Sequence, residues 1–194
     1  MRPPSEHTHW LFAAGFLFLG VCVLTQTIVG DEVWNGSRWR RYLWPGFGFL
    51  MGLCMWPVVV FFTSSTIHML AHAAWAQTMT LAGAAHLGLA SGRLRSRYWK
   101  LTMPVAFLVS GAAFLIHEQH GWLYNRSSFV HHVCAWTLIV GALFPLLQTF
   151  RPRSALLKTG FALTFIVLAT ALFASRDTAP IFGHLSPSAG ISRP

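Results

Sequence analysis

The most pronounced deficit in this sequence is in charged residues. Asp, Glu, Lys and Arg make up 10% of its 194 residues, whereas a soluble globular protein contains about 25%. Hydrophobic residues make up 54%, and the mean hydropathy is +0.52. So few charges cannot cover a surface that faces water, whereas a surface that faces lipid needs almost none. The composition therefore excludes an ordinary soluble domain and predicts an integral membrane protein.

Acidic residues are the scarcest of all. The sequence contains five Asp and Glu but fourteen Lys and Arg, which gives a formal net charge of +9. A basic balance is also typical of proteins that bind nucleic acid. Here, however, the basic residues lie between long apolar segments, where they anchor and orient membrane spans. We therefore expect a lipid bilayer as the partner and no nucleic acid.

Cysteine is also scarce. The three cysteines, Cys22, Cys54 and Cys134, lie inside apolar segments and form no CxxC motif. An odd and scattered set of this kind argues against a disulfide framework. We expect these side chains to pack as small apolar groups.

The long apolar segments are what the sequence has in abundance. A helix needs about 20 apolar residues to cross the hydrocarbon core, and lipid offers no partner for unpaired peptide groups. The sequence predicts one all-α membrane domain over residues 1–194, with six spans at residues 10–29, 45–62, 67–90, 101–116, 129–147 and 159–173. The first segment exceeds the ~7–15 apolar residues of a signal peptide, so we expect it to be retained as a span.

The basic residues predict the orientation of these spans. The loops after the first, third and fifth spans must share one side, and they hold ten of the fourteen Lys and Arg: Arg38, Arg40, Arg41, Arg93, Arg95, Arg97, Lys100, Arg151, Arg153 and Lys158. Cytoplasmic loops carry such an excess. The prediction is a multi-pass protein of the cell membrane, such as a bacterial inner membrane, with both termini extracytoplasmic.

Histidine is the unusual residue in so apolar a chain, with ten copies. His68 and His72 are one helical turn apart and share a helix face, which Trp75, Met79 and His86 continue. Two further pairs are His117 with His120, which close the fourth span, and His131 with His132, which open the fifth. His131 and His132 point about 100° apart on a helix, so only one of them is expected to face the others.

These pairs predict a metal site near the extracytoplasmic face. Neutral imidazole is the commonest metal ligand in proteins, and ionisable residues within membrane spans indicate function. The candidate ligands are His68, His72, His117, His120, His131 and His132, with Glu118 as a further ligand or as the hydrogen-bond partner of one. Copper is favoured for a histidine-rich outer site, with iron or zinc as alternatives.

The other histidines favour simpler interpretations. His7, His9 and His184, taken singly, are typical of the wet interface at helix ends. His86 is the only histidine in the cytoplasmic half, where packing or hydrogen bonding is the first expectation and a weak role in cofactor binding the second.

The histidine motifs resemble a known family. The sequence Phe-Leu-Ile-His-Glu-Gln-His-Gly at residues 114–121, followed by Phe-Val-His-His at residues 129–132, is similar to the transmembrane protein 45 family and its bacterial relatives. His9 before a Phe- and Gly-rich span, and His68 with His72 in a middle helix, fit the same pattern. The resemblance covers about half of the chain and implies a histidine-rich helical bundle with a metal. The chain has one predicted span fewer than the family's usual seven, and Ser110 stands near where the family often carries Glu.

Two alternatives to a metal site remain open at this point. A single haem b near the outer face would make the protein an electron carrier, whereas a second haem is excluded because no other span offers an inner histidine to pair with His86. The chain could also be a non-catalytic subunit of a larger membrane complex, including one that binds pigment through histidine.

The orientation can be tested with reporter fusions. A reporter at Trp99 is expected on the cytoplasmic side and a reporter at Asn125 on the outer side, because the basic loops face the cytoplasm. Alkaline phosphatase and fluorescent-protein fusions at each position measure the side directly. The reverse result, or one side for both positions, would contradict the predicted orientation.

Overall fold

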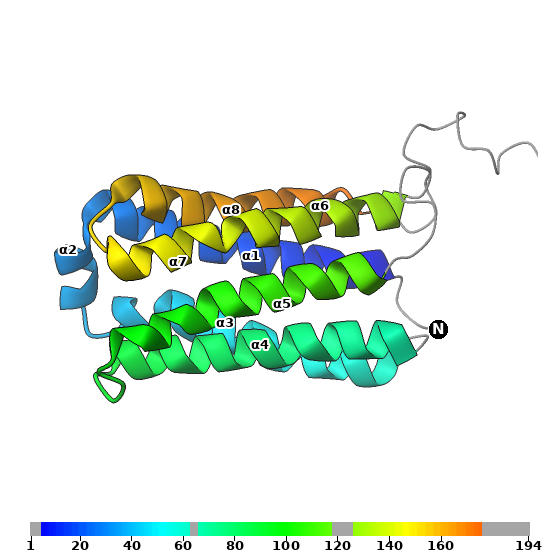
Figure 1. Ribbon diagram of the computed structural model, residues 1–194, viewed down its shortest axis with the longest axis horizontal. Coiled ribbons are helices and arrows are strands. Elements are labelled where there is room, and N and C mark those ends of the chain that lie inside the picture. The colour runs from blue at the N-terminus through cyan, green and yellow to red at the C-terminus, as the bar shows by residue number, and fades with distance from the viewer. Residues whose placement is uncertain (1–4, 63–65, 118–125, 176–194) are drawn as a thin grey trace, which may run out of the picture.

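The computed structural model describes residues 5–62, 66–117 and 126–175, and nearly all of them are helical. The helices are α1 (Ser5–Val29), α2 (Asp31–Gly36), α3 (Arg40–Phe62), α4 (Thr66–Ala90), the 3₁₀ helix η1 (Arg97–Leu101), α5 (Thr102–His117), α6 (Arg126–Gly141), α7 (Leu143–Phe150) and α8 (Ala155–Phe173). The long helices lie alongside one another in one bundle (Figure 1). The predicted all-α membrane bundle is confirmed as the fold class.

The six predicted spans correspond to long helical stretches, with one difference. The fifth is built from two helices, α6 and α7, which meet at Ala142. Backbone hydrogen bonds continue across this junction, from Ala142 N to Leu138 O at 2.8 Å and from Leu146 N to Ala142 O at 3.2 Å. Pro145 has no N–H to donate in the first turn of α7, so the irregularity falls where one hydrogen bond is necessarily missing.

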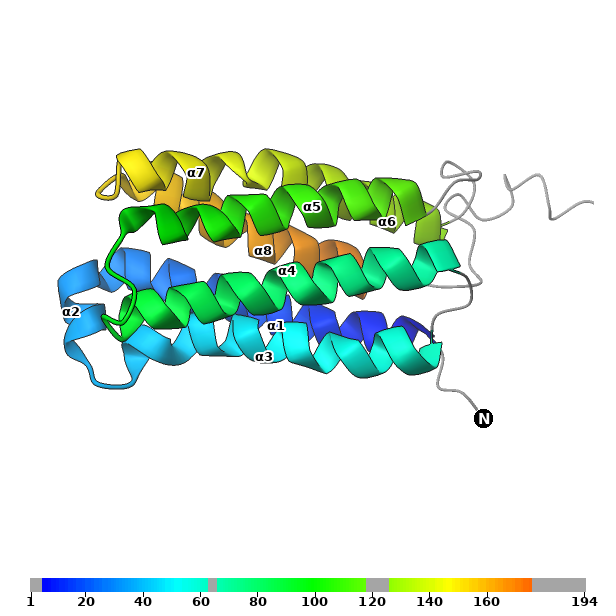
Figure 2. The same cartoon turned by 60° about the horizontal axis from the view of Figure 1, so that its bottom comes forward.

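Five stretches of helix are long and apolar enough to cross a membrane by length and composition: His7–Val29, Arg40–Phe61, Arg97–Ile116, Ser128–Phe150 and Ala155–Phe173. Helix α4 is equally long but is not among them. It carries no charged residue, so its polar side chains, among them His68, His72 and His86, account for its lower hydropathy. Figure 2 shows that α4 lies alongside α3 and α5, antiparallel to both, over the length of the bundle.

Large apolar side chains are exposed on all six spans. Examples, with their exposed fractions, are Leu11 70%, Val60 67%, Leu70 59%, Val105 54%, Trp136 57% and Leu156 78%. Soluble monomeric proteins rarely expose so much contiguous apolar surface. An outer surface of this kind fits contact with lipid.

Several glycines allow neighbouring helices to approach closely. The most extensive pairings are α3 with α4 and α1 with α8. A Cβ added at Gly52 of α3 would lie 2.5 Å from Thr80 N, and one added at Gly83 of α4 would lie 2.5 Å from Phe49 N. Small residues permit such contact between backbones, and this packing drives helix association in lipid.

Gly52→Ala should therefore destabilise the bundle, by about 1–3 kcal/mol as is usual for overpacking. Gly48→Ala, one turn earlier on α3, is the matched control, because a Cβ there meets nothing within 4 Å. Thermal unfolding of the purified proteins in detergent measures both. Equal melting temperatures for the two variants would contradict the role assigned to Gly52.

Candidate functional sites at the two ends of the bundle

Polar side chains gather at opposite ends of the bundle. We call the end where α1, α4 and α6 begin the histidine end, because it holds His9, His68, His72, His131 and His132. We call the other end the basic end. It carries the connection 30–39, which includes α2, the loops 91–96 and 151–154, and the ten basic residues counted above. Figure 1 has the basic end, marked by α2, on the left. The three basic loops therefore share one end, as the sequence predicts.

At the histidine end, three helices bring histidines together. The rings of His9 on α1 and His131 on α6 meet edge to face, with centroids 5.4 Å apart. His72 on α4 lies within electrostatic range of both. His72 and His131 are buried, with exposed fractions of 7% and 3%. Imidazoles from three separate helices thus converge inside the bundle.

The contacts of these rings orient them. Ser175, just after α8, hydrogen-bonds to His9 Nδ1 through its hydroxyl at 3.2 Å. Phe114 of α5 stacks on His131 at a centroid distance of 5.6 Å. Five helices therefore contribute to the surroundings of the three histidines.

Two histidines use Nδ1 in the same way. His72 Nδ1 lies 2.9 Å from the carbonyl of His68, and His132 Nδ1 lies 2.9 Å from the carbonyl of Ser128. A carbonyl only accepts, so Nδ1 carries the proton and donates in both cases. Metal-binding histidines commonly make such a bond, which leaves Nε2 as the coordinating atom.

The predicted ligands can now be located. His68, His72, His131 and His132 all lie at the histidine end, and the rings of His68 and His72 are 4.4 Å apart. His131 is buried and His132 is half-buried, so one of the pair faces inward. His117 ends α5 at this same end, but its side chain, together with Glu118 and His120, lies outside the described residues.

His9 is the residue that sequence reasoning missed at this end. The sequence alone favours the wet interface at a helix end for His9, as it does for His7 and His184. His184 lies outside the described residues. The structure instead places His9 against His131. Its position before a Phe- and Gly-rich span, noted in the family resemblance, was the available signal.

Among the side chains that the structure describes, no three His, Cys, Asp or Glu form a group ready to hold a metal ion. The histidines at this end are neighbours, but their ring nitrogens do not already surround one point.

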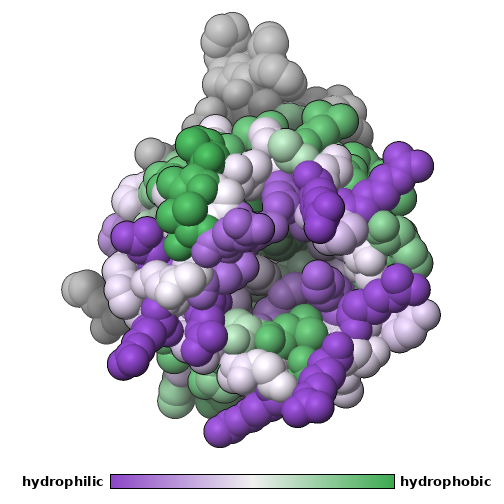
Figure 3. All heavy atoms as spheres, turned by 90° about the vertical axis from the view of Figure 1, so that its left-hand side faces the viewer, coloured by the Kyte–Doolittle hydropathy of each residue, from purple (hydrophilic) through white to green (hydrophobic). Residues whose placement is uncertain are grey.

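The basic end contains a pocket of about 210 Å³. Polar or charged side chains supply most of its lining: Gln26, Thr27, Asp31, Asn35, His86, Lys100, Gln148 and Lys158. Trp44, Phe161, Val23, Pro145 and Pro152 complete the walls. Figure 3 shows hydrophilic side chains around a hollow in the middle of this end.

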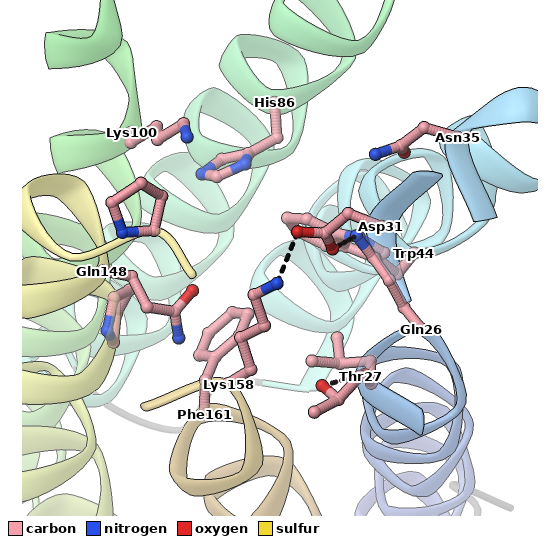
Figure 4. A pocket seen from close by; sticks show the side chains of 13 residues that line it. Gln26, Thr27, Asp31, Asn35, Trp44, His86, Lys100, Gln148, Lys158 and Phe161 are labelled. Carbon is pink, nitrogen blue, oxygen red and sulfur yellow. Dashed lines mark hydrogen bonds and ion pairs between the residues drawn. The ribbon is translucent and has the colours of Figure 1, made fainter. Parts of the chain in front are cut away.

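A chain of hydrogen bonds joins one side of the pocket. Trp44 Nε1 donates to Gln26 Oε1 at 3.0 Å, and Gln26 Nε2 donates to Asp31 Oδ1 at 3.0 Å. Lys158 Nζ pairs with Asp31 Oδ2 (Figure 4). Gly30 lies between α1 and α2 and has a φ of 87°, a conformation that glycine adopts readily. The chain therefore changes direction there and brings Asp31 of α2 to the pocket.

His86 contributes a half-buried ring to the wall of the pocket. Its ring lies 4.9 Å from that of Trp44, and Lys100 is an electrostatic neighbour. The Nε2 atom is buried and has no hydrogen-bond partner. A buried polar atom without a partner carries a free-energy cost, which a bound ligand can remove.

The sequence did not indicate this pocket. Its residues come from α1, α2, α3, α4, η1, α7 and α8, and none forms a motif with another. The one available signal was Asp31, an acid in a loop otherwise rich in arginine.

Comparison with protein-family models, with curated proteins and with solved structures finds no match for this chain. The fold and its two polar ends define the class: a multi-pass helical membrane bundle with histidines at one end and a charged pocket at the other.

The Asp31–Lys158 pair should contribute little to stability. The side chains are 42% and 20% exposed, and exposed pairs are worth about 0.2–1 kcal/mol. A double-mutant cycle with Asp31→Asn and Lys158→Met, followed by unfolding in detergent, measures the coupling. Arg153→Met, in the loop just before α8, controls for the loss of one charge. A coupling of several kcal/mol would show that the pair is structural.

Proposed function

We propose that this membrane protein binds a transition metal ion at the histidine end, with copper the favoured ion and iron or zinc the alternatives. The observation that carries the proposal is the convergence of His9, His72 and His131 from three helices. Placing an imidazole inside an apolar bundle costs free energy, and coordination of one metal ion by all three rings would offset that cost.

The chemistry of the donors supports this class of metal. The described side chains at this end offer imidazole nitrogens and no carboxylate, and such donors suit copper and zinc rather than calcium or magnesium. The Nδ1 bonds of His72 and His132 to backbone carbonyls are the kind that orient metal-binding histidines. Since no three described donors already form a complete group, binding requires the rings to move toward a common point.

His72 and His131 are the buried ligands in this proposal, and His9 joins them from α1. His68 and His132 are flanking ligands in this proposal: His68 lies one turn from His72 on α4, and His132 follows His131 on α6. His117, His120 and Glu118 belong to the connection after α5 and are further ligands by sequence. The proposal includes the kinship with the transmembrane protein 45 family, because His9, His68 and His72 carry part of that resemblance.

A haem is less well supported than a metal ion held by histidines alone. The rings of His9 and His131 are in edge contact, which leaves no room for a porphyrin plane between them. The subunit alternative is compatible with the metal site, because a metal-binding subunit can still belong to a larger complex.

Metal content of the purified protein tests the proposal. After loading with copper or zinc and desalting, wild type should retain stoichiometric metal by elemental analysis. His72→Ala and His131→Ala should weaken binding at least tenfold, since even outer-shell partners of metal ligands matter by about 10–100-fold. His9→Ala should also weaken it.

His7→Ala is the matched control, because His7 is exposed and lies on the same turns of α1 as His9. It should keep wild-type metal. Wild type without metal, or three variants that retain it fully, would refute the proposal. A Soret band in the visible spectrum would replace it with haem binding.

A further inference from the structure

We infer that the pocket at the basic end binds a small oxyanion, namely a carboxylate or phosphate group. The inference concerns the opposite end of the bundle from the proposed metal site and does not depend on it. It rests on the size of the pocket, its balance of charge and the enclosed Nε2 atom of His86.

The pocket is large enough for a small molecule. Its volume is about 210 Å³. A cavity of ~150 Å³ already holds benzene, so this pocket has room for a small organic molecule. The hollow lies in the middle of the basic end, ringed by hydrophilic side chains (Figure 3). A ligand can therefore enter from the aqueous side of this end.

The charge of the lining favours an anion. Among the described residues that line the pocket, Asp31 is the one acid, against the two ammonium groups of Lys100 and Lys158. Both carboxylate oxygens of Asp31 are engaged, one by Gln26 and the other by Lys158. Lys100 has no acidic partner among the described residues, so the pocket has one ammonium in excess.

His86 adds a directional donor beside that ammonium. A neutral imidazole protonated at Nε2 donates one hydrogen bond, and His86 Nε2 is buried without a partner. Because Lys100 is its electrostatic neighbour, one oxyanion can accept from both. Figure 4 shows the two side chains close together at the edge of the pocket.

The remaining lining suits a small organic anion. The side-chain amide of Asn35, which lines the pocket, offers a further donor. Trp44 and Phe161 provide aromatic walls. The surrounding basic loops raise the local concentration of anions.

A cation is disfavoured in the same place. It would meet the ammonium groups of Lys100 and Lys158, and the one carboxylate is already neutralised. The oxyanion has two sources: a free anion in solution, or the phosphate of a lipid headgroup, since anionic lipids attract basic segments at the cytoplasmic surface.

Inorganic phosphate and acetate are the probes. Each is titrated into the purified full-length protein in detergent at constant ionic strength, with chloride as the reference, and binding is followed by calorimetry and by the melting temperature. At least one should bind saturably and raise the melting temperature. Lys100→Gln should weaken that binding at least tenfold. His86→Ala should weaken it too, and His86→Gln, which keeps an N–H donor, should restore part of it.

Arg95→Gln is the matched control, because Arg95 lies in the same loop region, is exposed and does not line the pocket. Equal losses in Arg95→Gln and Lys100→Gln would reduce the effect to general surface charge and overturn the inference. The absence of saturable binding for both anions would also overturn it.

Nanodiscs distinguish the two sources of the oxyanion. Phosphate that binds equally well with and without phosphatidic acid identifies a free anion as the ligand. Phosphate that is displaced by phosphatidic acid identifies a lipid headgroup, and both results support an oxyanion site.

Discussion

Close packing of helices at small residues is the constraint on which the rest of this structure depends. In lipid, apolar side chains gain nothing by leaving the solvent, so association relies on backbone approach and packing. Gly52 and Gly83 bring α3 and α4 together, and Gly20 does the same for α1 against Ala162 and Ile166 of α8. These two pairs hold α4 and α1 at the positions from which both polar ends are built.

Helix α4 links the two ends. Its buried face carries His72, Trp75 and Met79, and His86 lies beyond them at the basic end. Midway, Thr78 and Ser110 of α5 lie 3.4 Å apart through their hydroxyls. So many polar groups would be costly on a lipid-facing helix, and the neighbouring helices shield them. The low hydropathy of α4 follows from these polar side chains, and its contacts with α3 and α5 place it inside the bundle.

Different interactions accommodate the polar groups at the two ends of the bundle. At the histidine end the groups are imidazoles, which are stacked on aromatic rings and oriented by carbonyls. At the basic end the Asp31–Lys158 ion pair, the amide of Gln26 and the indole of Trp44 form a connected network at a pocket. We propose a metal ion as the ligand of the first arrangement and a small oxyanion as the ligand of the second.

The sequence by itself determined the helical class, the approximate limits of the long helices and the placement of His68 and His72 on one helix face. These follow from local rules: lipid enforces backbone hydrogen bonding within each segment, and helical periodicity places residues four apart on one face. The break at Ala142 lies beside Pro145 and has a local signal that the span prediction did not use. The sequence could not anticipate the contact of His9 with His131, or the pocket around Asp31, Lys158 and His86. Those features join segments far apart in the chain. Only the tertiary structure decides them, because the rotation and depth of each helix depend on which small residues of its neighbours it meets.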